Sequence, residues 1–349
     1  MKQIKMFVSA ILVLGLLATL SACTNSQTPS TETTTQNVTG QSTVQSSDSK
    51  KIKIGVSFDA LQSQFWLANY DAIKEEADKL GVEIIEAIAE GDSNKQLQQI
   101  ENLIAANVDA IICVPKDNKA IVAAIQKAND ANVYFITDNR SADEGARVDL
   151  EVGADSFEMA KSEAQWLVDD AKSKNTKYYV LELLGDLKDV NAMLRDKAFN
   201  EVADANPDYL EVVAQVPTEW KAETALSGTV NALQANKEIN CIFVPSDSLL
   251  PSVLSALQQQ NRYFKADDPN HVVVASFDGA KEGLDAIRDG YVDIDMVQDA
   301  VLEGKLCVQG AVKLVKGETL ESNQILEEGF AVTRDNFEET SVKAWAYME

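Results

Sequence analysis

From residue 51 onward, short apolar runs alternate with longer segments of helical periodicity. The first run, 52–56, precedes a helix expected over 65–80, whose apolar residues recur on one face and whose left-handed stop is Gly81. Later runs of the same kind repeat this plan. They predict strands at 82–88, 110–114, 134–137, 178–181, 210–216, 241–244, 272–276 and 292–297.

Several of these runs are apolar at every position rather than at alternate ones, for example 111–114 and 272–275. Such strands are typical of parallel sheets that are covered by helices on both sides. The chain of 349 residues suits two domains of ordinary size. The pattern therefore predicts an α/β protein in which a doubly wound, Rossmann-like parallel sheet is present twice.

The N-terminal segment differs from the rest of the chain. Lys2 and Lys5 precede an apolar run over 6–20, so residues 1–22 are predicted to be a signal peptide. Leu20-Ser21-Ala22-Cys23 resembles the bacterial lipobox, which predicts a lipid on Cys23; the alternative is an ordinary cleavage site beside an accidental cysteine. Residues 23–50 are predicted to be the lipidated cysteine and a flexible polar tether.

Composition narrows the chemistry. A formal net charge of −24 disfavours nucleic acid and anionic lipid headgroups as partners. The four cysteines form no CxxC pair, so we expect neither a disulfide framework nor a metal site, and no cofactor. The solitary His271 begins an apolar run and is interpreted as structural, which disfavours most hydrolytic mechanisms.

Polar and aromatic residues recur where the predicted strands end. In open parallel sheets, ligands bind beyond the carboxyl ends of the strands. A sugar needs planar hydrogen-bonding groups around its edge and aromatic rings against its faces. Alternatively, each aspartate caps a helix and each tryptophan packs on a loop. The candidate ligand-binding residues are Asp59, Phe65, Trp66, Lys116, Asp138, Asn139, Arg140, Arg195, Trp220, Ser246, Asp247, Asp278 and Gln298.

A family resemblance follows from segments spread over 51–349. They are Ile54-Gly55-Val56-Ser57, Phe65-Trp66, Glu76-Ala77-Asp78-Lys79-Leu80-Gly81, Ile112-Cys113-Val114-Pro115-Lys116-Asp117, Ile136-Thr137-Asp138-Asn139, Leu194-Arg195-Asp196-Lys197-Ala198-Phe199, Phe277-Asp278-Gly279 and Gln298. Together they resemble the type I periplasmic binding proteins of the ribose, galactose and xylose class, the receptors of sugar importers of the ATP-binding-cassette (ABC) type.

The resemblance implies roles for individual residues. Phe65 and Trp66 would form the aromatic wall of the first lobe, and Trp220 would oppose them. Asp138 and Asp278 would be carboxylates in the plane of the sugar, Arg195 the arginine of the second lobe, and Gln298 a residue by the hinge. Asn139 stands where the ribose-type pattern has arginine, Ser63 and Ser246 are shorter than the expected asparagines, and Val114 offers no side-chain hydrogen bond. These departures argue against ribose itself.

The same resemblance implies how the chain divides. It would cross between lobes near residues 155, 298 and 323, which together form a multi-strand hinge. The first lobe would combine 51–154 with 299–322, and the second 155–298 with 323–349. The expected protein is a monomeric, extracytoplasmic receptor, lipid-anchored to the bacterial cell membrane, that passes a small sugar to a membrane permease.

Three other functions compete with this interpretation. A regulator of the lac-repressor type shares the two-lobed core but needs a basic helix-turn-helix where this chain has a lipobox and an uncharged tether. A secreted hydrolase could use Asp138 and Asp278 as paired carboxylates, but the sequence shows no activated nucleophile, so we do not expect an enzyme. A receptor for quorum signals or nucleosides would use the same fold with other contacts in the cleft.

Overall fold

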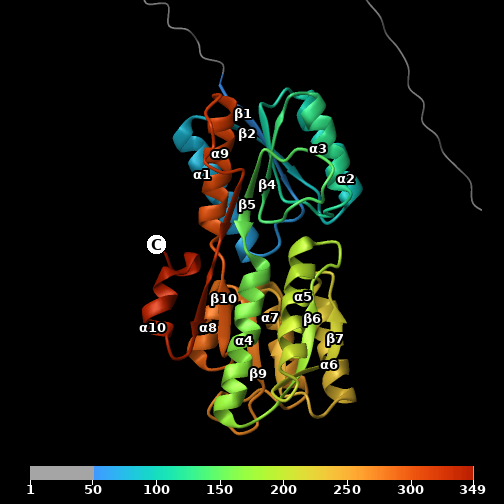
Figure 1. Ribbon diagram of the computed structural model, residues 1–349, viewed down its shortest axis with the longest axis vertical. Coiled ribbons are helices and arrows are strands. Elements are labelled where there is room, and N and C mark those ends of the chain that lie inside the picture. The colour runs from blue at the N-terminus through green and yellow to red at the C-terminus, as the bar shows by residue number, and fades with distance from the viewer. Residues whose placement is uncertain (1–50, 349) are drawn as a thin grey trace, which may run out of the picture. The chain divides into compact units, whose positions relative to one another are not determined.

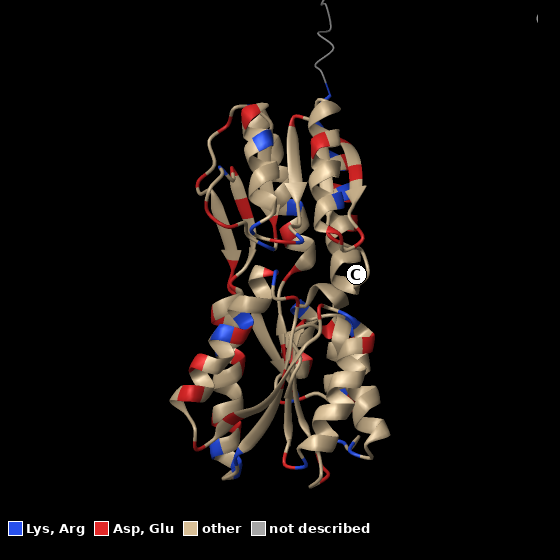
Figure 2. Ribbon diagram, turned by 90° about the vertical axis from the view of Figure 1, so that its right-hand side faces the viewer, with Lys and Arg blue, Asp and Glu red and all other residues tan. Residues whose placement is uncertain are grey.

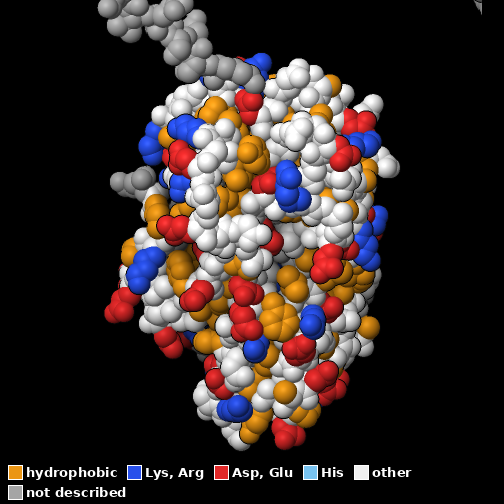
Figure 3. Space-filling view, turned by 45° about the horizontal axis from the view of Figure 1, so that its top comes forward, with side chains coloured by type: hydrophobic (Ala, Val, Ile, Leu, Met, Phe, Trp, Pro, Cys, Tyr) orange, Lys and Arg blue, Asp and Glu red, His pale blue; other side chains and the backbone are white. Residues whose placement is uncertain are grey.

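The computed structural model describes residues 51–348, which form two lobes built on six-stranded sheets (Figure 1). The predicted signal peptide, the tether and Cys23 lie outside the described residues. Within 51–348, none of the helices has the length and apolar character needed to cross a bilayer. Acidic and basic side chains are interspersed along the helices of both lobes (Figure 2) and on the face shown in Figure 3.

The first sheet has the strand order β11-β5-β4-β3-β1-β2, with all neighbours parallel. One of its faces packs against α1 and α9 and the other against α2 and α3. Its strands are β1 Lys53–Phe58, β2 Glu83–Ile88, β3 Ala110–Cys113, β4 Tyr134–Asp138, β5 Leu150–Ala154 and β11 Gln324–Glu327. Its helices are α1 Gln64–Leu80, α2 Ser93–Ala105, α3 Ile121–Asp130 and α9 Ala300–Val315.

The second sheet has the order β12-β10-β9-β8-β6-β7, and only β12 runs antiparallel to its neighbour. Its strands are β6 Tyr178–Leu184, β7 Leu210–Pro217, β8 Cys241–Phe243, β9 Val273–Asp278, β10 Ile294–Val297 and β12 Phe330–Thr333. Its helices are α4 Ser156–Lys174, α5 Val190–Ala205, α6 Ala222–Ala235, α7 Leu250–Gln259, α8 Lys281–Asp289 and α10 Phe337–Thr340. Three short 3₁₀ helices, Asp247–Leu249, Ser341–Lys343 and Trp345–Tyr347, complete the described chain.

Side-chain caps fix the N-terminal ends of α1 and α5. The Ser63 hydroxyl accepts a hydrogen bond from the backbone N–H of Trp66 at 3.2 Å and begins α1. Asp189 begins α5 in the same way, because its carboxylate accepts from the backbone N–H of Asn191 at 2.9 Å. Such caps satisfy backbone donors that have no partner within the helix. They also hold Trp66 and Asn191 at the junction of the lobes.

The strands β5, β11 and β12 were not predicted from the sequence. The run Leu150-Glu151-Val152-Gly153 is too mixed to stand out, and β11 is an exposed edge strand with little apolar signal. Residues 324–327, which were expected in the second lobe, pair with β5 in the first sheet. The last crossing therefore follows Glu327, and the other two lie between β5 and α4 and between β10 and α9.

Candidate functional site

A cavity of about 430 Å³ lies where the carboxyl ends of the two sheets face each other. This is the position at which open parallel sheets bind ligands. Its volume falls within the usual range of small-molecule sites. The predicted residues that line it are Asp59, Phe65, Trp66, Asn139, Arg140, Arg195, Trp220, Ser246, Asp278 and Gln298.

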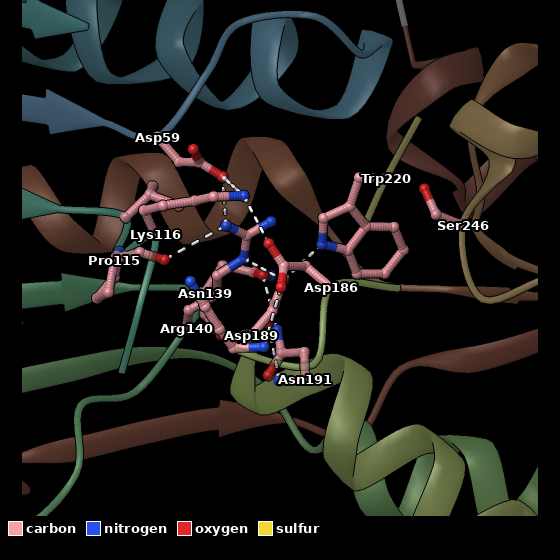
Figure 4. Close-up of polar contacts among 12 residues, drawn as sticks. Asp59, Pro115, Lys116, Asn139, Arg140, Asp186, Asp189, Asn191, Trp220 and Ser246 are labelled. Carbon is pink, nitrogen blue, oxygen red and sulfur yellow. Dashed lines mark hydrogen bonds and ion pairs between the residues drawn. The ribbon is translucent and has the colours of Figure 1, made fainter. Parts of the chain in front are cut away.

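One wall of the cavity is organised by the buried guanidinium of Arg140 (Figure 4). Its Nη1 lies 2.8 Å from Asp59 Oδ2, and its Nε lies 2.7 Å from Asp189 Oδ2. The group also lies 5.2 Å from the centre of the Trp66 ring, and Asp189 accepts from Trp220 Nε1 at 3.0 Å. Burial opposes the charge of Arg140, but Asp189 and Asp59 outweigh it and raise its pKa. Arg140 thus contacts Trp66 of the first lobe directly and Trp220 of the second lobe through Asp189.

A second wall is built around Arg195, which is also buried. Its Nη1 donates to the carbonyl of Pro245 at 2.7 Å, and its Nη2 donates to the Ser156 hydroxyl at 3.3 Å. The guanidinium lies 3.7 Å from the centre of the Phe277 ring and 3.8 Å from Asp278 Oδ1. Its Nε is buried without a hydrogen-bond partner. Burial lowers the pKa of Arg195, an effect that Asp278 partly offsets.

Asp278 presents a carboxylate that is held from two sides. It accepts from the Ser246 hydroxyl at 2.6 Å and from Gln298 Nε2 at 2.7 Å. Burial raises its pKa, and the nearby Arg195 opposes that rise. These contacts fix the direction of the carboxylate within the cavity.

Asn139 lines the cavity and contacts residues of both lobes. Its φ is 61°, in the left-handed region that asparagine tolerates better than most residues. Its amide donates to Gln298 Oε1 at 3.1 Å and to Glu303 Oε2 at 3.0 Å, and it accepts from Asn191 Nδ2 at 2.9 Å. Because Asn191 and Gln298 come from the second lobe, this amide connects both lobes.

Lys116 was predicted to contact ligand, but it does not line the cavity. Its Nζ lies 2.8 Å from Asp186 Oδ2 of the second lobe and 3.9 Å from Asp59 Oδ2 of its own lobe (Figure 4). The backbone N–H of Asn118 also donates across the junction, to the carbonyl of Lys188 at 3.3 Å. Lys116 therefore serves contact between the lobes.

Asp138 also lies outside the cavity, contrary to its predicted place. Asp138 is the last residue of β4 and its side chain points toward α1, whereas the next two residues lie beyond the strand and line the cavity. Asp138 is fully buried, and its Oδ1 accepts from Asn69 Nδ2 at 3.2 Å. It therefore cannot pair with Asp278 across the cavity in the manner of a hydrolase.

Asp247 is the third predicted residue outside the cavity. Its carboxyl accepts from the Ser276 hydroxyl and from the backbone N–H of Ala280, the latter at 2.8 Å. Burial and the neighbouring Asp295 raise its pKa well above the ordinary value. Asp247 thus holds the residues on either side of Asp278 through hydrogen bonds, outside the cavity.

Asp138 should make stability depend on pH. Burial raises its pKa to about 7, whereas an aspartate in an unfolded chain titrates near pH ~4. The folded state retains the proton longer, so this residue's contribution to stability falls as pH rises from about 4 to about 7. Relative to the wild type, Asp138→Asn should gain stability over that interval, on the order of 2 to 4 kcal/mol.

Chemical denaturation at several pH values measures this effect. Asp130→Asn is the matched control, since Asp130 is exposed on the same lobe. The difference in stability between Asp130→Asn and the wild type should be the same at every pH. A constant difference for Asp138→Asn as well would contradict the assignment of a buried proton to Asp138.

Sequence reasoning missed several residues of the cavity. Asp189 and Asn191 were overlooked because β6 was expected to end at 181, whereas it continues to Leu184 and moves the following loop to the cavity. The pattern Asp-x-Asn before an apolar helical segment is a capping signal that could have found them. Ser63, which stands where the resemblance expects asparagine, also lines the cavity, and the other missed polar lining residues are Gln62, Lys221, Glu223, Thr224 and Ser248.

The chain matches known proteins over most of its length. The family model described as "Periplasmic binding protein domain" matches residues 54–319. The ribose import binding protein of Bacillus subtilis is 29% identical over 79% of this chain and 86% of its own length. The D-xylose-binding periplasmic protein of Haemophilus influenzae is 27% identical over 85% of this chain and 91% of its own length.

A solved structure supports the same assignment. It is an ABC transporter solute-binding protein from Bacillus halodurans with bound myo-inositol, with 30% identity and a TM-score of 0.77. The match covers 85% of this chain and 99% of that one. The two parallel-sheet lobes, the site between their carboxyl ends and these matches agree. The chain therefore belongs to the family of type I periplasmic binding proteins.

Proposed function

We propose that this protein binds a neutral, polyhydroxylated small molecule, a monosaccharide or a cyclitol, in the cavity between its lobes. The observation that carries the proposal is the combination of planar polar groups and aromatic rings drawn from both lobes. Arg195 and Asp278 can exchange paired hydrogen bonds with neighbouring hydroxyls, and Trp66 and Trp220 offer ring faces. These groups match the edge and the faces of a sugar ring.

The charges of the site favour a neutral ligand. Arg140 and Lys116 lie against Asp59, Asp186 and Asp189, so these cations are already paired. A phosphate or carboxylate on the ligand would compete with these acidic groups, and like charges disfavour its burial. The ligands named for the relatives, ribose, xylose and myo-inositol, are neutral polyols and support the proposal by analogy.

A thermal-shift screen tests the proposed ligand class. The panel contains D-ribose, D-xylose, D-allose, L-arabinose, D-apiose and myo-inositol, with nucleosides and sugar phosphates as comparison groups. A ligand at a hundred times its Kd should stabilise the folded state by about 2.7 kcal/mol. Stabilisation by nucleosides alone, or by no member of the panel, would reject the proposal, and turnover of a bound sugar would reject a purely binding role.

We further propose that the ligand holds the lobes closed and that the closed form delivers it to an ABC importer. Contacts such as Lys116–Asp186 and Arg140–Asp189 already join the lobes in this structure. A ligand shifts the equilibrium between open and closed forms only if it binds one form more tightly than the other. Contacts from both lobes supply that difference in affinity. Three chain crossings would act as the hinge.

The proposed location is the outer side of the cell membrane, with a lipid on Cys23. The support is the sequence Leu20-Ser21-Ala22-Cys23 after an apolar run, together with the polar tether that follows. Cys23→Ala should release the protein from membranes or leave the precursor uncleaved. Fractionation and labelling with a fatty-acid analogue measure this, with Cys241→Ala as the control because Cys241 is buried in the second lobe. An unlabelled wild type, or normal processing and membrane retention of Cys23→Ala, would refute the anchor.

A further inference from the structure

Trp345 lies behind the cavity and contacts one of its walls in each lobe. Its indole Nε1 donates to the backbone carbonyl of Asp278 at 3.0 Å, at the end of β9 in the second lobe. Its ring meets that of Phe65 on α1 of the first lobe edge-on, with 6.0 Å between the ring centres. Both Asp278 and Phe65 line the cavity, whereas Trp345 does not.

Trp345 belongs to a segment beyond the part of the chain that the family model matches. That match ends at residue 319, and Trp345 follows α10 in the C-terminal segment. In Figure 1 this red segment turns from α10 toward the junction of the two lobes. Trp345 is 8% exposed, so it is held there as part of the packed structure. Because Trp345 does not line the cavity, any role in binding must act through the residues that it contacts.

The backbone of Asp278 explains what the indole contact does. Its φ is 117°, in a region that residues with a side chain rarely adopt. Such a conformation persists only where the surroundings fix it. Hydrogen bonds do so on both sides of this peptide: Trp345 donates to the Asp278 carbonyl, and Asp295 Oδ1 accepts from the backbone N–H of Gly279 at 3.1 Å. Asp247 accepts from the backbone N–H of Ala280 at 2.8 Å.

We propose that Trp345 is a positioning residue for ligand binding, which holds the strained backbone of Asp278 and seats Phe65 against the second lobe when the lobes meet. This role rests on the proposed function of the cavity. Without the indole N–H, the buried carbonyl of Asp278 lacks a partner and its backbone can relax, which turns the carboxylate away from its place between Ser246 and Gln298.

The effect should fall mainly on dissociation. Trp345 touches one lobe through Phe65 and the other through Asp278, so its contacts favour the closed form. A contact that is made fully only in the closed form slows the release of ligand more than it speeds its capture. A tryptophan that only stabilised the second lobe would change the melting temperature and leave the rate of release unchanged.

Trp345→Phe tests the role, because phenylalanine keeps a ring against Phe65 and removes the donor to Asp278. The matched control is Trp166→Phe on α4, a partly buried tryptophan packed on the core of the second lobe. The probe is whichever of D-ribose, D-xylose, D-allose, L-arabinose, D-apiose and myo-inositol binds the wild type most tightly. Trp345→Phe should bind it about tenfold more weakly, mostly through faster dissociation, since the loss leaves a buried carbonyl unpaired.

A second measurement follows the wild type itself. The chain has four tryptophans, so its indole ¹⁵N spectrum is simple, and Trp→Phe variants assign it. Adding the probe should slow hydrogen exchange at Trp345 Nε1 and leave Trp166 unchanged. Unchanged exchange at Trp345 would overturn the role, as would wild-type dissociation from Trp345→Phe or an equal loss in Trp166→Phe. A wild type that binds none of the six probes would instead overturn the proposed function.

Discussion

Replacing Arg195 with alanine is expected to weaken binding of the best neutral sugar by about 30- to 1000-fold. The guanidinium is buried beside Asp278 and over the Phe277 ring, and its unpartnered Nε leaves it a donor for a ligand oxygen. Its removal takes away charged hydrogen bonds to the ligand and leaves Asp278 buried without its cation. Together these losses amount to about 2 to 4 kcal/mol, and each 1.4 kcal/mol is tenfold in affinity.

Isothermal titration calorimetry measures this loss. Arg195→Lys keeps the charge but not the planar fork, so it should recover only part of the affinity. Lys197→Ala is the matched control, because Lys197 is exposed on the same helix, α5, and its ammonium lies 3.8 Å from Glu201 and 5.3 Å from the centre of the Phe157 ring. A folded Arg195→Ala protein with wild-type affinity would remove Arg195 from the site.

The second large effect is expected at Arg140, where the change should act on closure of the lobes. Its guanidinium joins Asp59 of the first lobe to Asp189 of the second, and all three side chains are buried when the lobes meet. Without it, closure buries Asp189 without its cation and leaves Asp59 with only the more distant Lys116, at 3.9 Å. Breaking a buried ion pair in this way costs about 3 to 5 kcal/mol, enough to move most of the population toward the open form.

Small-angle scattering follows this shift directly. A saturating probe sugar should reduce the radius of gyration of the wild type, whereas Arg140→Ala should stay expanded at the same concentration. Arg147→Ala should behave like the wild type, because Arg147 is exposed on the first lobe and pairs with Asp149 at 2.8 Å. Equal contraction of Arg140→Ala and the wild type would show that the Asp59–Arg140–Asp189 contact does not control closure.

The fold could be predicted because its strands are apolar on both faces, a local property of the sequence. Runs such as 111–114 and 272–275 need no partner to be recognised as buried parallel strands. The edge strand β11 lacked that signal, since most of its side chains face solvent. Its placement in the first sheet depends on pairing with β5, which lies far from it in sequence. For that reason the last boundary between the lobes lies after Glu327 and not at residue 323, where it was expected.

The site was predictable only to the precision with which strand ends can be placed. Expecting β4 to end at 137 made Asp138 the first residue of the loop, whereas it is the last residue of the strand and points away from the cavity. Asn139 and Arg140 occupy the positions that face the cavity. Successive side chains at a strand end point in different directions, so an error of one residue exchanges a side chain that lines the cavity for one that packs against a helix.

Partnerships among the polar residues could not be predicted at all. Asp59, Arg140 and Asp189 meet only after two lobes and several helices have been assembled. The sequence indicates that each is polar and near a strand end, but not that one guanidinium pairs with both carboxylates. The same is true of Trp345, whose partners Phe65 and Asp278 lie far from it along the chain.

The crossings between the lobes have a consequence for how the polypeptide folds. In the first lobe, α9 packs on the sheet and β11 is its edge strand. In the second lobe, β12 is the edge strand. Both lobes are therefore completed by residues from 300 onward. Neither lobe is a continuous stretch of sequence, and contacts between distant residues form slowly because long loops must close first. The lobes therefore cannot mature one after the other as the chain emerges from the ribosome. A nascent chain that lacks its last fifty residues has two unfinished cores at once, and it reaches the native state only when its C-terminal end arrives.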